Sequence, residues 1–197
     1  MPLITTLSGL LSEFPAPVAD ALARYRHQVF IEKLGWPLPV CNGSESDQFD
    51  RPDTVYVIAR DGSGRICGCA RLLPTLQPYL LADVFPSMFD DGPMPHSATV
   101  WELSRFASTA PRCTRRMLAA TVARAAREGA QRLLTISPLG VERLLQRMGV
   151  SIRRAGRPVR HEGQTIFACW IEIDAQTCEA LSVAPAGPAG NRDRQPA

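Results

Sequence analysis

The sequence predicts an α/β protein, a three-layer αβα sandwich built around a mixed β-sheet. Strand-like and helix-like segments alternate through the second half of the 197-residue chain, which is typical of parallel strands connected by helices. The first half carries a hairpin pattern, which adds antiparallel strands to the sheet. The length suits one hydrophobic core, so we expect one domain over residues 1–183 and a disordered tail, rich in Ala, Pro and Gly, over 184–197.

The first expected element is a long helix over residues 16–34, which Gly35 ends. Apolar side chains recur there at the spacing of one helix face, at Val18, Leu22, Tyr25, Val29 and Phe30. The next residues, 37–51, are polar and rich in Asn, Asp, Ser and Gly, so we expect a loop. This part of the sequence therefore predicts one helix, followed by a loop that packs few apolar side chains.

A β-hairpin is expected next. Residues 54–59 are β-branched and aromatic, 61–64 read Asp-Gly-Ser-Gly, and 65–73 are apolar enough for a returning strand. The following connection, 74–97, contains five prolines and several apolar residues. A connection of this length in a compact domain is usually functional or carries short helices.

The second half of the chain alternates between strands and helices. An alanine-rich stretch that Gly129 stops is the clearest helix. In order, we expect a strand over 99–107, a helix over 114–128, a strand over 132–137, a helix over 139–148 and a final strand over 164–174. This alternation is the main reason for predicting the sandwich.

Composition excludes several classes of protein. Hydrophobic residues make up 45% and charged residues 21% of the chain, and no stretch approaches the ~18 apolar residues of a membrane span. The N-terminus lacks the basic region and cleavage site of a signal peptide, so we expect a cytoplasmic protein without membrane insertion. Among six cysteines only Cys67-Gly-Cys69 is a close pair, and its spacing is not that of zinc or redox motifs. We therefore expect buried, reduced thiols and no metal site.

Arginines are concentrated in the second half of the sequence. Residues 112–132 contain six arginines and one acid, and residues 142–160 contain six more and one acid. Such a distribution suggests an acidic partner, although a solvated helix face is the favoured explanation for any single arginine. Neither segment contains an aromatic residue, so the stacking platforms of a nucleic-acid-binding protein are missing and no nucleic-acid partner is expected.

The tetrapeptide Glu102-Leu-Ser-Arg105 stands inside an apolar strand pattern. Buried charges are unfavourable unless they are paired, so a structural salt bridge is one explanation and an active site is the other. Plain strand alternation puts Glu102 and Ser104 on one face and Arg105 on the opposite face. All three side chains line one cleft only if a β-bulge intervenes, and bulges are common beside active sites.

Other charged and aromatic residues stand at fixed offsets around this tetrapeptide. The surrounding segments read YRHQVFIEKLGWPL, DQFDRPDTVYVIA, GCARLLPT and VWELSRFA. Together they resemble the acyl-homoserine lactone synthases, the autoinducer synthase family, over roughly residues 20–175. Eight positions match that family's signature in identity and order: Arg26, Phe30, Trp36, Asp47, Asp50, Arg71, Glu102 and Arg105.

The resemblance implies an N-acetyltransferase-like fold and a catalytic domain over 1–183. It also implies two reactions on one substrate. The α-amine of S-adenosyl-L-methionine attacks an acyl thioester on acyl carrier protein, and the methionine carboxylate then closes a lactone and expels methylthioadenosine. The product is a diffusible quorum-sensing signal. No cofactor is implied, because the sulfonium of the substrate is already a good leaving group.

Physical roles follow for the matched residues. Glu102 is the candidate general base, and the arginines hold the substrate carboxylate or orient acidic side chains. Phe30 and Trp36 pack on the adenine or face the sulfonium, unless they only fill the core. The catalytic set is Glu102, Arg105, Arg71 and Asp50. The substrate-binding set is Arg26, Phe30, Trp36, Asp47, Ser104 and Phe106.

Two further sets concern the acyl donor. The apolar strand near residue 135 predicts an acyl-chain pocket formed by Leu133, Thr135, Ser137, Met148 and Phe167. In the family, a threonine near the end of this strand accompanies 3-oxo acyl groups. The imperfect match here favours an unsubstituted, medium-length chain. Docking of acyl carrier protein is assigned to Arg115, Arg116, Arg124, Arg143, Arg147, Arg153 and Arg154.

An acyltransferase of the same fold class that uses acyl-CoA and another amine is the alternative. A glycine-rich loop that enters a helix would favour it, because such loops hold pyrophosphate groups. The segment before the alanine-rich helix, residues 108–114, contains no glycine. Some members of the resembling family use acyl-CoA, so the sequence constrains the reaction more tightly than the donor.

Overall fold

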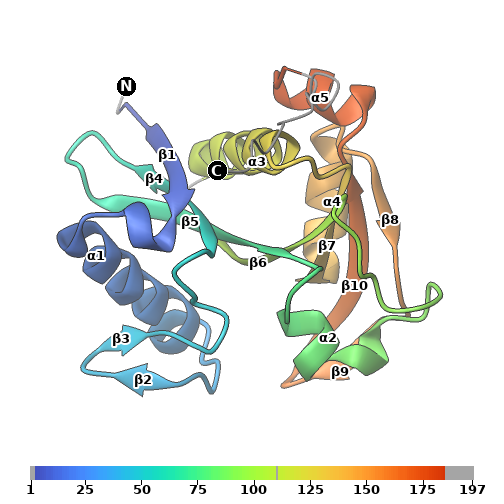
Figure 1. Ribbon diagram of the computed structural model, residues 1–197, viewed down its shortest axis with the longest axis horizontal. Coiled ribbons are helices and arrows are strands. Elements are labelled where there is room, and N and C mark those ends of the chain that lie inside the picture. The colour runs from blue at the N-terminus through green and yellow to red at the C-terminus, as the bar shows by residue number, and fades with distance from the viewer. Residues whose placement is uncertain (1–2, 110, 185–197) are drawn as a thin grey trace, which may run out of the picture.

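The computed structural model describes residues 3–109 and 111–184 (Figure 1). Apart from Ala184, the predicted tail lies outside these residues. The helical elements are η1 (Leu11–Glu13), α1 (Ala16–Arg26), η2 (His27–Lys33), α2 (Leu80–Val84), η3 (Pro86–Met88), α3 (Pro111–Arg127), α4 (Leu139–Arg147) and α5 (Ala175–Leu181). The strands are β1 (Thr5–Leu10), β2 (Val40–Cys41), β3 (Ser44–Glu45), β4 (Val55–Arg60), β5 (Ile66–Pro74), β6 (Val100–Ser108), β7 (Arg132–Pro138), β8 (Ile152–Arg154), β9 (Val159–His161) and β10 (Gln164–Glu172).

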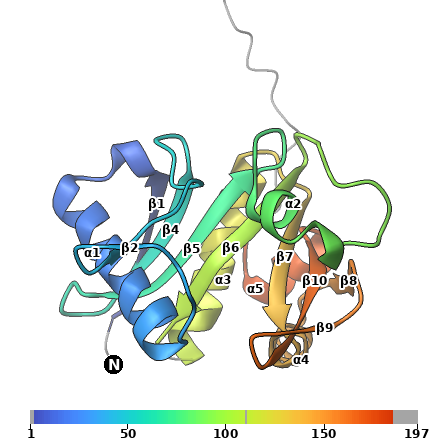
Figure 2. The ribbon, with the colours of Figure 1, turned by 90° about the horizontal axis from the view of Figure 1, so that it is seen from below.

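An eight-stranded sheet forms the middle layer, in the order β1-β4-β5-β6-β7-β10-β8, and β9 also pairs with β10. β6 and β7 run parallel, whereas the other neighbours in this sheet are antiparallel. The mixed sheet, with helices on both faces, confirms the predicted αβα class (Figure 2).

Within the described ranges, no helix has the length and apolar character that a membrane span needs.

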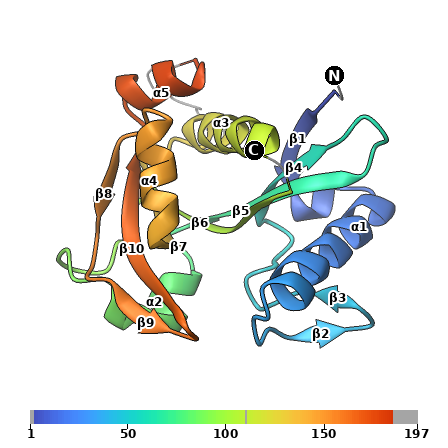
Figure 3. The same cartoon turned by 180° about the vertical axis from the view of Figure 1, so that it is seen from behind.

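Strand alternation separates the core into two sides. On β4, Val55 and Val57 belong to the cluster that includes side chains of α3, α4 and α5, while Tyr56 and Ile58 pack with α1. Figure 3 shows α4 lying along β7 and β10, with α3 and α5 beyond its end. A third cluster, which includes Leu81 of α2, covers the α1 side of β7 and β10. The face carrying α1 and α2 is the one on which the cleft described below opens.

All the predicted helices and strands are present, with bounds that differ by a few residues. The expected helix over 16–34 is helical throughout, but it widens into the π-helical turn η2 after Arg26. The sequence did not predict β1, the β2–β3 hairpin, β8, β9 or α5. The strands among these are two to six residues long. β1 depends on pairing with the distant β4, whereas the hairpins β2–β3 and β9–β10 are local but involve strands too short to show a periodic pattern.

The two parallel strands at the centre of the sheet separate. β6 and β7 pair over residues 100–102 and 132–134, but both strands continue well beyond these residues. In Figure 1, β5 and β6 run across the view while β7 and β10 run down it, so the sheet divides into two arms. Beyond the paired residues, the edges of β6 and β7 that face each other therefore present their backbone groups to an opening. On their other edges the two strands remain paired with β5 and β10.

The long connection that carries α2 is held against the far edge of the sheet. The backbone N–H of Asp90 donates to Ala155 O at 3.0 Å, and Arg157 lies 3.7 Å from the carboxylate of Asp90. Gly156 packs so closely on the backbone of Met88 that a Cβ at this position would overlap the Met88 carbonyl. The absence of a side chain at Gly156 thus allows the connection to lie where it does.

We predict that Gly156→Ala destabilises the protein by about 2 kcal/mol or more, because the new methyl group meets backbone and not a movable side chain. Thermal unfolding of the purified variant measures this change. Gly140→Ala in α4 is the matched control, since a Cβ at Gly140 has no neighbour within 4 Å. It should be neutral or stabilising. Equal melting temperatures for the two variants would contradict the proposed overlap.

Candidate active site

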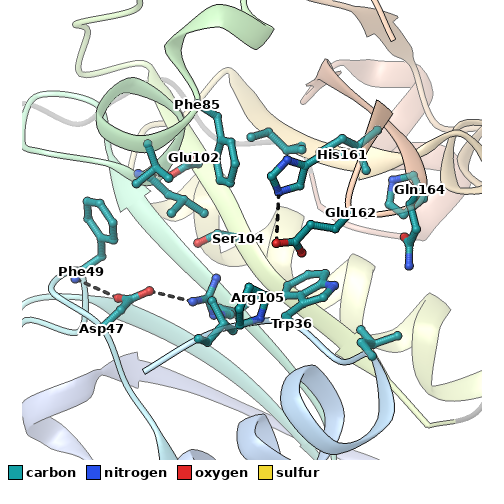
Figure 4. A pocket seen from close by; sticks show the side chains of 18 of the residues that line it. Trp36, Asp47, Phe49, Phe85, Glu102, Ser104, Arg105, His161, Glu162 and Gln164 are labelled. Atoms are coloured by element: carbon teal, nitrogen blue, oxygen red, sulfur yellow. Dashed lines mark hydrogen bonds and ion pairs between the residues drawn. The ribbon is translucent and has the colours of Figure 1, made fainter. Parts of the chain in front are cut away.

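A cleft of about 470 Å³ opens where β6 and β7 separate (Figure 4). Side chains of Glu102, Ser104 and Arg105 on β6 line its floor. Its walls come from the segment 34–39 after η2, residues 47–49, the helix α2 with Phe85, the end of β7, and the turn between β9 and β10 with the start of β10. The cleft therefore brings together segments from both halves of the chain around the tetrapeptide that the sequence singled out.

A β-bulge in β6 explains why all three polar side chains reach the cleft. Cys69 pairs with Ala107 and Arg71 with Ser104, so Arg105 and Phe106 together face the single residue between Cys69 and Arg71. Arg105 has φ 50, a left-handed conformation that is uncommon outside glycine. The extra residue turns Arg105 to the same side as Glu102 and Ser104. The sequence predicted this arrangement on the condition that a bulge occurs, and the structure confirms the bulge.

Beneath the cleft, three arginines and three acids form a closed ring of alternating charges. Arg26 Nε donates to Glu45 Oε2 at 2.5 Å, and Arg105 Nη2 donates to the other oxygen of Glu45 at 2.9 Å. Arg105 Nη2 also donates to Asp47 Oδ2 at 2.8 Å, an interaction visible in Figure 4. This half of the ring connects α1, β3 and β6.

The other half of the ring runs through β5. Arg71 Nη1 donates to Asp47 Oδ1 at 2.6 Å and to Asp50 Oδ1 at 2.9 Å, and Arg26 Nη1 closes the ring by donating to Asp50 Oδ1 at 2.8 Å. The hydroxyl of Tyr56 accepts from Arg26 and donates to Asp50. Arg71 Nε donates in addition to Ser104 Oγ at 3.0 Å. The ring thus includes five of the eight signature residues, together with Glu45, which the sequence analysis had not singled out.

The ring is buried and formally neutral, since its three positive and three negative groups balance. The three arginine side chains are at most 4% exposed and the three acids at most 6%. Burial by itself would raise the pKa of Asp50, but Arg26 and Arg71 outweigh it and hold that pKa well below its usual range. Asp50 therefore stays ionised, and each of the six charges depends on its two neighbours for compensation.

Glu45 is the ring member that sequence reasoning missed. Its side chain is fully buried between Arg26 and Arg105. In the sequence it lies in a polar loop, two residues before Asp47, where a solvated acid would be ordinary. The spacing Glu45-x-Asp47-x-x-Asp50 was the available signal, because three acids at such offsets opposite three arginines suggest a shared site.

Among the described residues, Glu102 forms no ion pair with an arginine. Its two carboxylate oxygens accept the backbone N–H groups of Leu80 and Leu81, both at 2.8 Å, at the start of α2. Burial raises the pKa of Glu102 to about 7, although these two hydrogen bonds and the charges of Arg71 and Arg105 act in the opposite direction. Glu102 therefore lines the cleft and holds the N-terminal end of α2 in place. With a pKa of about 7, its carboxyl group changes protonation near neutral pH.

The aromatic residues divide between the cleft and the core. Trp36 lines the cleft and stacks on Phe30, with ring centroids 5.0 Å apart and an interplanar angle of 22°. Phe30 is only 1% exposed and lies behind Trp36. Phe106 was predicted to bind substrate, but it packs into the core beside α3, because the bulge turns it away from the cleft. Trp101, which is partly buried, and Trp170, which is buried, pack in the core.

The residues predicted to form the acyl-chain pocket do not line this cleft. Side chains alternate along β7, and Ile136 and Pro138 are the ones that line it. On the opposite face, Leu133 and Met148 belong to the core beneath α3 and α4. The strand-like pattern predicted β7 correctly, but it did not show which face is open. The five predicted residues, Leu133, Thr135, Ser137, Met148 and Phe167, are absent from the cleft walls.

Five of the seven arginines assigned to partner docking have acceptors within the chain. Arg153 pairs with Asp91 at 2.7 Å, Arg154 with Glu142 at 2.7 Å, and Arg124 with Glu128 at 2.8 Å. The guanidinium of Arg116 donates to Ile4 O, and that of Arg115 to Ala180 O.

The remaining two arginines, Arg143 and Arg147, are exposed on α4. In the part of the chain that the structure describes, neither has an ion pair or a side-chain hydrogen bond. They are therefore free to meet an acidic surface.

Comparison with solved structures defines the fold class. Escherichia coli ElaA superposes with a TM-score of 0.61 at 11% identity, covering 86% of this chain and all of that one. A candidate N-acetyltransferase from Lactobacillus plantarum also gives a TM-score of 0.61, at 19% identity, covering 87% of this chain and 99% of that one. At such identities the likeness concerns the fold alone. The protein therefore has the α/β fold of the N-acetyltransferases.

Sequence comparison defines the family within this fold. The family model of the autoinducer synthases matches residues 14–181. An acyl-homoserine-lactone synthase of Ralstonia solanacearum is 52% identical over 89% of this chain and 92% of its own length. A homologue from Acinetobacter nosocomialis is 42% identical over 85% of this chain and 98% of its own length. This chain belongs to the autoinducer synthase family, and it is an enzyme of the acyl-homoserine-lactone synthase class.

Two related crystal structures contain small molecules. TofI, in a ternary complex with an inhibitor and MTA, is 52% identical and superposes with a TM-score of 0.86, covering 92% of this chain and 98% of that one. BjaI, a CoA-dependent acyl-homoserine lactone synthase with SAM and isopentyl-CoA bound, is 25% identical with a TM-score of 0.81, covering 95% of both chains. The solved relatives therefore include a CoA-dependent enzyme.

We predict that Glu45→Gln lowers the free energy of unfolding by about 3–5 kcal/mol, because it leaves Arg26 and Arg105 buried without a shared counter-charge. Urea denaturation measures the change. Glu128→Gln is the matched control, since Glu128 forms an exposed pair with Arg124 on one helix. That variant should change stability by less than about 1 kcal/mol. If the two substitutions have the same effect, the ring does not stabilise the fold as argued.

Proposed function

We propose that this enzyme makes an N-acyl-L-homoserine lactone from S-adenosyl-L-methionine and an acyl group carried on acyl carrier protein. The observation that carries this proposal is the floor of the cleft. There, Glu102, whose pKa is about 7, lies on the same side of β6 as Arg105. A carboxylate whose pKa lies near neutral pH suits removal of a proton from an ammonium group. The MTA bound to TofI and the SAM bound to BjaI are consistent with this substrate.

The first step is acylation of the substrate amine. Ionised Glu102 takes a proton from the ammonium group, directly or through water, and the nitrogen lone pair then attacks the thioester carbonyl carbon. The proton that Glu102 accepted passes to solvent, and Glu102 then takes the second proton from the attacking nitrogen. The carbon–sulfur bond of the thioester breaks and the thiolate leaves with this second proton, so that an amide and a free thiol remain. The backbone N–H groups of Leu80 and Leu81 hold the carboxylate in one orientation while it does this.

The second step is lactone formation. An oxygen of the substrate carboxylate attacks the γ-carbon, and the bond from that carbon to sulfur breaks with its electron pair on the sulfur. Methylthioadenosine and the acyl-homoserine lactone are the products. Arg105 uses Nε and Nη2 in the buried ring, so its Nη1 is left for the carboxylate of a bound substrate. Because the sulfonium is the leaving group, we propose that no metal or prosthetic group takes part.

Acyl carrier protein is the donor that we favour over acyl-CoA. Beyond residues 102 and 134, the separated strands present backbone groups to which an extended, amide-containing pantetheine arm could pair. Arg143 and Arg147 stand exposed on α4, and an acidic carrier protein complements them. The CoA dependence of BjaI shows that the family also accepts the other donor, so this choice needs its own experiment.

The acyl group that we propose is unsubstituted and of medium length. The walls beside β7 and β10 present the apolar side chains of Ile136 and Ile166, and α2 adds Val84 and Phe85. A 3-oxo group buried against these side chains would lack a hydrogen-bond donor, which is unfavourable. Length is limited because a cleft of about 470 Å³ must also hold S-adenosyl-L-methionine.

The test of the proposed function is product analysis. Purified enzyme incubated with S-adenosyl-L-methionine and acyl-carrier-protein thioesters of different acyl groups should release an N-acyl-homoserine lactone, identified by mass spectrometry. Unsubstituted acyl groups of about six to eight carbons should give the highest kcat/KM by the volume argument. A dominant 3-oxo product refutes the acyl assignment, and the absence of any lactone refutes the function.

We predict that kcat/KM for S-adenosyl-L-methionine rises with pH through an apparent pKa near 7, the value to which burial raises Glu102. The base is active only when ionised, so activity is lost as pH falls below that pKa, by about tenfold per pH unit. Rates measured in buffers of constant ionic strength provide the test. A flat profile between about pH 5.5 and 8 contradicts the assignment.

Glu102→Gln should lower turnover at least tenfold. It also places an amide –NH₂ against the N–H of Leu80 or Leu81, so its melting temperature must be compared with that of the wild type. Loss of turnover in a folded variant supports the base, whereas near-normal turnover rejects it.

We predict that Arg143→Glu/Arg147→Glu raises KM for the acyl carrier protein several-fold and leaves the binding of S-adenosyl-L-methionine unchanged. Raising the ionic strength to ~0.3 M should mimic this loss in the wild type, because the Debye length falls below about 8 Å. Arg24→Glu/Arg65→Glu is the control, since it makes the same charge change at exposed positions near the other end of the sheet. An unchanged carrier-protein KM, or a preference for acyl-CoA, overturns this docking model.

A further inference from the structure

The turn between β9 and β10 places an acidic side chain in the cleft. His161 pairs with Gln164, which leaves Glu162 and Gly163 as a two-residue turn. Both have positive φ, 46 for Glu162 and 79 for Gly163, as a type I′ hairpin turn requires. Asn, Asp or Gly usually occupies the position of Glu162, and a longer side chain there is unfavourable by about 1 kcal/mol. The turn nevertheless carries Glu162, whose side chain points into the cleft (Figure 4).

Glu162 differs from the other acids of the cleft in how its charge is compensated. Asp47 is bound by Arg71 and Arg105 in the buried ring, and Glu102 accepts two backbone N–H groups. Within the described residues, the ion-pairing neighbour of Glu162 is the half-exposed His161, whose Nε2 lies 4.0 Å from Glu162 Oε1 and which is charged only when protonated. The ring beneath is neutral, so it offers Glu162 no net compensation. A ligand with a positive charge would therefore be attracted to this carboxylate.

An aromatic ring lines the cleft across from this turn. Trp36 stacks on Phe30, and its backbone N–H donates to Phe30 O at 2.9 Å. Phe30 covers one face of the indole, and Trp36 is among the side chains that border the open space (Figure 4). An aromatic face together with a carboxylate is the usual recognition site for an onium cation, because the ring quadrupole and the negative charge both attract it.

We propose that Glu162 and Trp36 together recognise the sulfonium of S-adenosyl-L-methionine, with Glu162 as the residue that distinguishes this cation from neutral thioethers. This inference rests on the proposed function and assigns a residue of the β9–β10 turn to it. The attraction exists only while the sulfur is charged. When the bond from the γ-carbon to sulfur breaks, the electron pair stays on sulfur and the charge disappears. Glu162 thus favours binding of the substrate and ceases to hold the thioether product.

Glu162→Gln is the test, because it keeps the size of the side chain and removes its charge. Isothermal titration should show S-adenosyl-L-methionine binding weakened at least threefold. Binding of S-adenosylhomocysteine, which has the same amine, carboxylate and ribose but a neutral sulfur, should change less than twofold. In turnover, KM for S-adenosyl-L-methionine should rise by the same factor while kcat stays within twofold. Glu179→Gln, at an exposed position on α5, controls for the loss of one negative charge and should alter none of these values.

Other outcomes overturn the proposal. Equal weakening of S-adenosyl-L-methionine and S-adenosylhomocysteine would mean that Glu162 contacts a part that both molecules share. No weakening of either would mean that it contacts neither. The melting temperature of Glu162→Gln confirms that the turn is intact, and Glu162→Asp, which keeps the charge, should retain a preference for the sulfonium compound. Failure of the proposed function can be distinguished from failure of this proposal. In that case the wild-type enzyme itself would bind no S-adenosyl-L-methionine and release no lactone.

Discussion

The closed ring of Arg26, Glu45, Arg105, Asp47, Arg71 and Asp50 is the constraint on which the site depends. Each charge is buried, so each is stable only while its two neighbours remain in place. The six residues come from α1, β3, the loop after β3, β5 and β6. Forming the ring therefore fixes the N-terminal helix and the acidic loop on the sheet, and it defines the wall of the cleft that carries Trp36.

The β-bulge connects this structural ring to the chemistry above it. Because Arg105 adopts a left-handed conformation, one guanidinium both completes the ring and reaches the cleft. Glu102 stands outside the ring; two backbone N–H groups bind its carboxylate, and Arg71 and Arg105 act on it only through their charge. That difference keeps Asp50 ionised at all ordinary pH values while the pKa of Glu102 lies at about 7. Two kinds of carboxylate, one structural and one that titrates, thus lie close together on the same side of the sheet.

Much of the site was predictable because charged residues are conspicuous in apolar strands. Glu102 and Arg105 were recognised in this way, and the resemblance to the autoinducer synthases brought in the other signature residues. Glu45 was missed because an acid in a polar loop is ordinary until the fold buries it. Phe106 and the five predicted acyl-pocket residues lie outside this cleft for a different reason. Their alternation was recognised, but alternation does not reveal which face a neighbouring helix covers.

By itself, the sequence determined the α/β class and the order of the main elements, since these follow from local periodicity. The resemblance of its motifs identified the family and every charged residue of the ring except Glu45. Tertiary structure alone decided which charges pair, which face of β7 is open, and that the turn carrying Glu162 lies in the same cleft as Trp36. These features depend on the bulge at Arg105 and on the separation of β6 from β7. Both arise from contacts between segments far apart in the chain, which no local pattern encodes.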